Sequence, residues 1–177
     1  TVELIVMDYG GQAEQAGASY RQLVDQGVFA VIGPIGSGDA ELVFPEAALL
    51  ETPVITGSAN KEGITELGEG WAFRNTATNT DLYAVALPIW ATIYDIQTAM
   101  LIFDQAFPVS AQAATLSIPN IVPKIGIELV NSATPITYSQ GDTDFSPVIQ
   151  QAQATEAEGI IILSAPVESG LIAQELV

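Results

Sequence analysis

The stretch from Val28 to Ala40 constrains the fold more than any other part of this sequence. Its first five residues, Val28 to Ile32, are apolar without polar alternation, which is typical of a parallel strand that helices cover on both faces. The remaining eight residues include three glycines and a proline, a composition that favours a tight turn before a helix. We therefore predict a buried strand, a glycine-rich turn and a helix start.

The turn around Ser37 and Gly38 has two interpretations. Free backbone N–H groups at a helix N-terminus can receive an anion such as a carboxylate, and Ser37 adds a hydroxyl beside them. Alternatively, the turn is an ordinary link between strand and helix, with Ser37 as the N-cap of the helix. The stretch by itself leaves both interpretations open.

Nucleotide-binding motifs do not fit this turn. Gly33 and Gly38 have the spacing of a P-loop, but Asp39 occupies the position of the phosphate-binding lysine and would repel phosphate. A dinucleotide fingerprint beginning at Gly36 requires a third glycine where Glu41 stands. The sequence therefore predicts no nucleotide site here.

Composition excludes several classes of function. Only four Lys and Arg residues stand against 21 Asp and Glu residues, and the resulting net charge of −17 argues against nucleic acid or anionic lipid as partners. The chain has no Cys and no His, which removes thiol nucleophiles, Ser-His-Asp triads and imidazole-bound zinc. No pair of acidic residues stands in a context that would raise a carboxyl pKa. We therefore expect a protein without catalytic residues, cofactor or metal.

The chain reads as alternating strands and helices. With 177 residues and 49% hydrophobic content it can form one large core or two small ones, and no apolar run approaches the length of a membrane span. The predicted strands cover residues 2–7, 28–32, 53–55, 71–76, 99–103, 125–130, 136–138 and 159–163. The predicted helices cover residues 12–25, 39–50, 81–94, 109–117 with interruption by prolines, 147–154, and 167 onward.

A second polar turn, from Ser58 to Asn60, follows the predicted strand at residues 53–55. Ligands of open α/β sheets collect outside the carboxyl ends of the strands. Because this turn and the Ser37 turn follow successive parallel strands, we expect them to line one crevice.

Six segments, in order, resemble the type I periplasmic solute-binding proteins, the branched-chain amino-acid binding family of ABC transporters. The segments are Leu23-Val24 with residues 27–34, Ser37-Gly38, residues 53–55 with Ser58-Ala59, Phe73-Arg74-Asn75-Thr76, residues 141–145 and residues 161–165. The resemblance implies an α/β fold of two Rossmann-like parallel-sheet lobes, placed at residues 1–94 and 95–177. Members of this family begin with an additional strand and helix and continue beyond position 177, so the chain resembles a fragment that is incomplete at both ends.

The resemblance also implies a binding site. Ser37 would take the carboxylate of an amino acid and Ser58 would offer its backbone carbonyl to the ammonium, with Gly38 and Ala59 as further ligand-binding residues of the two turns. Asn60 stands where the family has threonine, and its amide can donate to a carboxylate and accept from an ammonium. Phe107 is the nearest match to an aromatic ligand contact of the second lobe, and ordinary packing is an equal alternative for it.

The function implied is a non-catalytic, periplasmic or extracellular receptor that delivers a small amino acid to the membrane permease of an ABC transporter. The alternative is a ligand-binding sensor module of a receptor or regulator with the same fold. If parts of the family's fold are missing, apolar faces would be left uncovered, and we expect the chain to self-associate.

Overall fold

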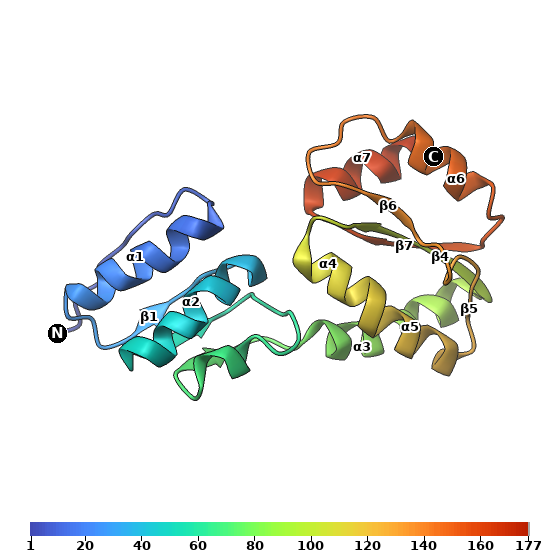
Figure 1. Ribbon diagram of the computed structural model, residues 1–177. Helices are drawn as coiled ribbons and strands as arrows, with labels where there is room; N and C mark the ends of the chain where they lie inside the picture. The colour runs from blue at the N-terminus through green and yellow to red at the C-terminus, as the bar shows by residue number, and fades with distance from the viewer. Residues whose placement is uncertain (177) are drawn as a thin grey trace. The chain divides into compact units, whose positions relative to one another are not determined.

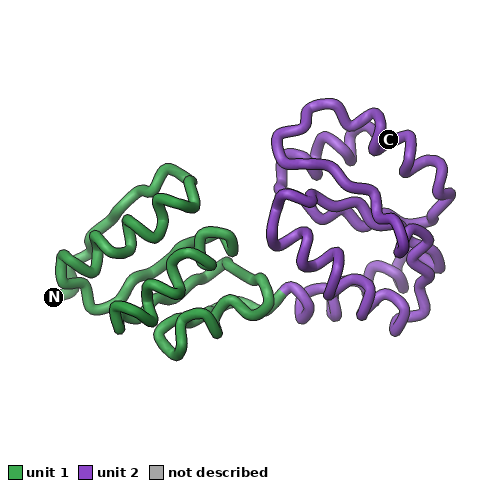
Figure 2. Tube along the Cα trace, in the orientation of Figure 1, with its two compact units in different colours: residues 1–78 green, residues 79–177 purple. Residues whose placement is uncertain are grey.

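The computed structural model describes residues 1–176 and divides the chain into two compact units, Thr1–Thr78 and the residues from Asn79 onward (Figure 2). Each unit is an α/β arrangement around a parallel sheet, as the sequence predicts. Among the helices of residues 1–176, none combines the length and the apolar character needed to cross a membrane.

Unit 1 is a three-stranded parallel sheet with its helices on one face (Figure 1). Its elements are α1 (Ala13–Asp25), β1 (Val31–Ile32), α2 (Ser37–Leu50), β2 (Val54–Thr56), the 3₁₀ helix η1 (Thr65–Gly68) and β3 (Ala72–Arg74). The row Val31, Val54 and Ala72 runs across the three strands and faces the core, in which Tyr20 of α1 and Phe44 of α2 are buried. One face of this sheet is therefore packed against helices.

The opposite face of the unit 1 sheet is exposed. The next row of paired residues is Ile32, Ile55 and Phe73, which are 85%, 38% and 49% exposed. Because side chains alternate between the two faces of a strand, covering one face alone leaves every second apolar residue in water. We call this row the open face.

The open face corrects two sequence predictions. The strand predicted at residues 28–32, with both faces covered, is reduced to Val31–Ile32, and Phe29 is 82% exposed. Residues 2–7 form no ladder with another strand, so the predicted first strand is absent from residues 1–176. A continuous apolar run predicts burial on both faces, but only covering elements can supply that burial.

Unit 2 is a three-layer α/β/α unit (Figure 1). Its elements are α3 (Asn79–Tyr94), β4 (Thr98–Asp104), α4 (Pro108–Gln112), the π turn η2 (Ala113–Ser117), α5 (Ile118–Ile121), the 3₁₀ helix η3 (Val122–Ile125), β5 (Glu128–Leu129), β6 (Ile136–Tyr138), α6 (Ser146–Gln153), β7 (Gly159–Leu163) and α7 (Pro166–Leu176). All strands pair in parallel around β4, with β7 along one edge and β5 and β6 at successive positions of the other.

Strand β4 shows why an unbroken apolar run marks a central strand. Leu101 and Phe103 join the core under α3, α4 and α5, whereas Met100 and Ile102 join the core under α6 and α7. Both sets of side chains are buried, so none of the positions from Ala99 to Phe103 faces water. Prolines interrupt the helical path that follows β4, and the path changes from α to π to α to 3₁₀ geometry, as the expected short or broken helix requires.

The boundary between the units differs from the predicted lobe boundary after Tyr94. Helix α3 belongs to unit 2, because Leu87 and Trp90 pack into the core that also contains Leu101. The units therefore divide between Thr78 and Asn79. A helix pattern alone does not say which sheet the helix covers.

Candidate functional site

The carboxyl end of the unit 1 sheet carries two polar turns that a hydrogen bond joins. The Ser37 turn (residues 33–38) follows β1, and the Ser58 turn (residues 57–61) follows β2. The backbone N–H of Lys61 donates to the Ser37 Oγ at 3.2 Å. The two turns that the sequence places at one edge therefore touch.

Thr56, the last residue of β2, forms hydrogen bonds with both turns. Its fully buried hydroxyl donates to the Pro34 carbonyl at 2.6 Å and accepts from the N–H groups of Ser58 at 3.3 Å and Ala59 at 3.1 Å. One side chain thus fixes the backbone of both turns. Sequence reasoning missed Thr56; the available signal was a hydroxyl residue at the end of an apolar strand, directly before a small-residue turn.

Ser37 is the first residue of α2 and is not its N-cap. The N-cap is Gly36, whose extended backbone has φ −79° and ψ 143°, so the N-cap interpretation of Ser37 is wrong. Ser37 is 6% exposed, and its Oγ accepts the Lys61 N–H. A serine hydroxyl that accepts one hydrogen bond keeps its own proton for a further acceptor. Ser37 can therefore donate to a carboxylate at the start of α2.

Gly33 needs to be glycine for the turn to form. Its φ of 131° lies in a region that residues with a side chain rarely adopt, and the peptide bond to Pro34 is cis. The turn thereby leads from β1 into the helix that places Gly38 in its first turn.

Charged residues that the sequence analysis did not assign to the site also lie at this edge. The Lys61 ammonium pairs with the Glu41 carboxylate, and the Lys61 carbonyl accepts from the Arg74 guanidinium at 2.8 Å. Arg74 is the last residue of β3, so all three strand ends contribute to the edge. These contacts fix the Ser58 turn and bring two basic side chains to this edge of the sheet.

Asp39, in the first turn of α2, accepts a hydrogen bond from the N-terminal segment. The Asp39 carboxylate accepts from the Tyr9 hydroxyl at 2.8 Å, and an acidic group here is also favoured by the positive end of the helix dipole. Burial, the hydrogen bond to Asp39 and the charges of Asp39 and Asp8 raise the pKa of Tyr9 to about 12. This pair anchors the N-terminal segment beside α2.

The other predicted site residues differ in what they can still offer. Ser58 is exposed and Asn60 half-buried, whereas Ala59 is buried in the core and its N–H already donates to Thr56. Of Ala59, therefore, the carbonyl is the group that could face a ligand.

Phe107 lies in unit 2. It immediately precedes α4, is half-buried, and its N–H donates to the Asp104 Oδ1 at 3.2 Å. The aromatic ring thus follows the end of β4, where the resemblance predicts it, and its contact with a ligand stays a prediction.

The groups at the edge of the unit 1 sheet include both hydrogen-bond donors and hydrogen-bond acceptors. The Ser37 hydroxyl, the first N–H groups of α2 and the Asn60 amide can donate to a carboxylate, while carbonyls of the Ser58 turn can accept from an ammonium. Within residues 1–176, no cluster of three or more Asp, Glu, His or Cys side chains could hold a metal ion.

The family described as periplasmic binding proteins matches residues 1–175 of the chain. No curated protein sequence matches this chain. Among solved structures, a leucine-binding protein from Thermotoga maritima superimposes with a TM-score of 0.84 at 20% identity, over 98% of this chain and 48% of that one. A branched-chain amino-acid binding protein from Streptococcus pneumoniae, in complex with isoleucine, gives 0.79 at 22% identity, over 98% and 48%.

A third similar structure has a different type of ligand. It is an ABC transporter solute-binding protein from Rhodopseudomonas palustris in complex with 3,4-dihydroxybenzoic acid, with a TM-score of 0.79 at 18% identity, over 98% of this chain and 46% of that one. At these identities the similarity establishes the fold. The chain spans about half the length of each of these proteins.

Proposed function

The chain belongs to the periplasmic binding protein family, and from this premise we propose that it is part of an extracytoplasmic solute-binding protein of an ABC transporter. In this proposal it performs no chemistry: it binds a small carboxylate-bearing solute, preferably an amino acid, and presents it to a membrane permease. The alternative is a sensor module that uses the same binding site.

The observation that carries the proposal is the Ser37 hydroxyl at the start of α2. It is held by the Lys61 N–H and keeps a proton that can be donated to a carboxylate. Isoleucine and 3,4-dihydroxybenzoic acid, the ligands of two similar structures, are both carboxylic acids. A carboxylate is therefore the group that we assign to Ser37 and Gly38.

The choice of an amino acid depends on the Ser58 turn. In the proposal, the Ser58 carbonyl accepts from the ligand ammonium, and the Asn60 amide lies beside both charged groups of the ligand. The Ala59 carbonyl and the Phe107 ring are further proposed contacts. An aromatic acid has no ammonium and would leave the carbonyls of Ser58 and Ala59 without a hydrogen-bond donor.

The test compares Ser37→Ala with the parent chain in titration calorimetry against isoleucine and against isoleucinol, its amino-alcohol analogue. Removing a hydrogen bond to a charged group costs about 1.5–3 kcal/mol, so isoleucine binding should weaken roughly ten- to a hundredfold. Binding of isoleucinol should change little, because that ligand has no carboxylate.

The amino alcohol is the control that separates binding from folding. Ser37→Ala also leaves the Lys61 N–H without its acceptor, so thermal unfolding should show a loss of about 1 kcal/mol of stability. A loss of folding stability would lower the affinity for isoleucine and for isoleucinol by the same factor. An equal loss of affinity for both compounds would show that Ser37 only supports the turn, and preferential binding of 4-hydroxybenzoate over isoleucine would contradict the assignment of an amino acid.

A further inference from the structure

The fully buried carboxylate of Asp104 joins two turns at the carboxyl end of the unit 2 sheet. Asp104 is the last residue of β4, and its Oδ1 accepts from the N–H groups of Ala106 at 2.9 Å and Phe107 at 3.2 Å, in the turn that follows β4. The same oxygen accepts from the N–H of Gln140 at 3.1 Å, in the turn that follows β6. One side chain therefore fixes both turns, including the backbone of Phe107.

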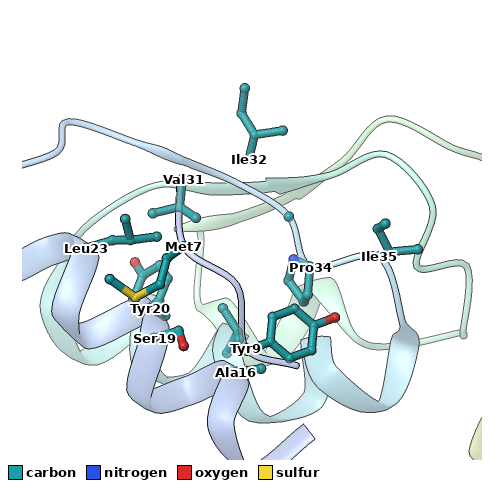
Figure 3. A pocket seen from close by; sticks show the side chains of 12 residues that line it. Met7, Tyr9, Ala16, Ser19, Tyr20, Leu23, Val31, Ile32, Pro34 and Ile35 are labelled. Atoms are coloured by element: carbon teal, nitrogen blue, oxygen red, sulfur yellow. The ribbon is translucent and has the colours of Figure 1, made fainter. Parts of the chain in front are cut away.

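Unit 1 contains a similar arrangement at the carboxyl end of its own sheet. Thr56, also fully buried, is the last residue of β2 and bonds to its own turn and to Pro34 in the turn that follows β1. Figure 3 shows Pro34 and Ile35 of that turn, which also line a cavity of unit 1. The Thr56 turns carry the solute contacts proposed for unit 1, and the Asp104 turns carry Phe107, the contact proposed for unit 2.

Asp104 differs from Thr56 because it brings a negative charge. Its second oxygen, Oδ2, is buried and has no hydrogen-bond partner among the residues that the structure describes. The three N–H groups on Oδ1 are neutral donors, so they stabilise the carboxylate without cancelling its charge. Water screens a buried charge less than an exposed one, so the field of Asp104 reaches groups that its side chain does not touch.

Two further carboxylates add to the negative field at this end of the sheet. Burial raises the pKa of Tyr138, the last residue of β6, and so do three carboxylates near its hydroxyl. These carboxylates are Asp104, Glu168 and Asp142, in decreasing order of effect. Glu168 lies in the first turn of α7, so the positive end of that helix offsets part of the charge but not all of it.

The one basic residue of unit 2 lies at the other end of the sheet. Lys124 is the only Lys or Arg that follows Arg74 in the sequence. It belongs to η3, which leads into the start of β5, where Glu128 pairs with Thr98, the first residue of β4. Lys124 is therefore at the amino end of the sheet, and the carboxyl end with Asp104 stays negative.

We infer that Asp104 makes unit 2 selective for solutes that carry a positively charged group, such as the ammonium of an amino acid. The selection rests on the proposed function, in which Phe107 contacts the solute. Asp104 does not have to touch the solute, because it positions the Phe107 turn and acts through its charge. An aromatic acid is an anion without an ammonium and is repelled at the same place. This end of unit 2 therefore favours an amino acid over an aromatic acid.

The experiment uses titration calorimetry to measure how Asp104→Asn changes the binding of two ligands to the full chain. One is isoleucinol, a cation, and the other is 3-methylpentanoate, an anion that has the carbon skeleton of isoleucine without the ammonium. Asparagine keeps an oxygen that can accept the three N–H groups but has no charge. We expect isoleucinol to bind roughly three- to tenfold more weakly and 3-methylpentanoate to bind more tightly. A distorted turn would weaken both ligands, so changes in opposite directions identify an effect of the charge.

Glu158→Gln is the matched control. Glu158 accepts from the N–H groups of Gln97 and Thr98 at the amino end of the sheet, so the substitution removes one negative charge far from the Asp104 turns and should leave both affinities unchanged. Glu168→Gln is a second test that does not depend on whether Asp104→Asn folds. It removes a charge from the carboxyl end and should shift the two affinities in the same opposite directions, by less than Asp104→Asn does.

The pKa of Tyr138 reports the field without any ligand and can be measured by carbon-13 NMR of labelled tyrosine. Asp104→Asn should lower this pKa toward its usual 10.0, and Glu158→Gln should not change it. Affinities that change in the same direction, equal effects of the two substitutions, or an unchanged Tyr138 pKa would overturn the selective role of Asp104.

The selective role of Asp104 and the proposed function can fail separately. Binding of 4-hydroxybenzoate without binding of isoleucinol up to roughly millimolar concentration would overturn the selection of a positive group and leave a solute-binding function in place. Ser37→Ala tests the carboxylate contact of unit 1 and should change isoleucine binding whatever the effect of Asp104→Asn.

Discussion

At the scale of single residues, the proposed solute site depends on a side chain that would not itself touch the ligand. The Thr56 hydroxyl reaches Pro34 in one turn and the N–H groups of Ser58 and Ala59 in the other. Because these bonds are buried, the two turns keep their geometry without a ligand, and little ordering cost is left for binding. Thr56 is therefore a positioning residue for the proposed donors and acceptors.

The Tyr9–Asp39 pair gives a prediction at the same scale. Asp39→Asn should lower the pKa of Tyr9 from about 12 toward its usual 10.0, because it removes a negative charge and weakens the hydrogen bond, whereas burial stays. Carbon-13 NMR of labelled tyrosine measures this pKa directly. Asp8→Asn is the control and should have a smaller effect, since the Asp8 charge is the weakest of the causes; equal shifts would contradict the role of Asp39.

The same pair makes stability depend on alkaline pH. Between about pH 10 and pH 12, folded Tyr9 keeps its proton while the unfolded chain loses it, so the free energy of unfolding decreases as pH rises through this window. Tyr9→Phe should reduce that slope, which urea unfolding at several pH values would show.

At the scale of elements, unit 2 is packed so closely that a glycine in β7 carries a structural role. A Cβ at Gly159 would lie 2.4 Å and 2.5 Å from ring atoms of Trp90 in α3 and 3.2 Å from the Ile96 Cγ2. Strand glycines often mark such close approaches. The Trp90 ring thus occupies the space into which a side chain at position 159 would project.

Gly159→Ala should therefore destabilise the chain by about 1–3 kcal/mol through overpacking. Denaturant unfolding followed by tryptophan fluorescence measures the change. Gly170→Ala in α7 is the matched control: its Cβ would meet nothing within 4 Å, and the substitution should stabilise the helix by about 0.5–1 kcal/mol. A Gly159→Ala chain as stable as the parent would show that Trp90 can move away at no cost.

Whether a segment forms a helix or a strand was easier to predict from the sequence than which segments it pairs or packs with. Strand β4 follows from its apolar run, and α6 follows from Ser146-Pro147, because these signals are local. The strand at residues 2–7, the length of β1 and the unit to which α3 belongs depend on which distant segments pair and pack, and no local pattern contains that information. The site behaves in the same way: the turns at Ser37 and Ser58 are visible in the sequence, but the Thr56 bonds between them are not.

At the scale of the whole molecule, the two units differ in how completely their sheets are covered. Unit 2 has a core on each face of its sheet, including Leu101 on one side and Ile102 on the other. Unit 1 has one core, and its open face presents Ile32, Ile55 and Phe73 to water. Contiguous exposed apolar patches of this kind favour association or aggregation.

We therefore expect the chain to self-associate through the open face, which sedimentation velocity over a range of concentrations would detect. The net charge of −17 opposes association, so added salt should strengthen it by screening that repulsion. The double substitution Ile55→Thr and Phe73→Thr places threonine, which favours strands, at both positions but removes apolar area, and should yield a monomer. Leu49→Gln, which removes a 75% exposed apolar side chain from α2 instead, should associate as the parent does. A parent chain that sediments as a monomer at all concentrations, in low and high salt, would show that the open face is too small to hold two copies together.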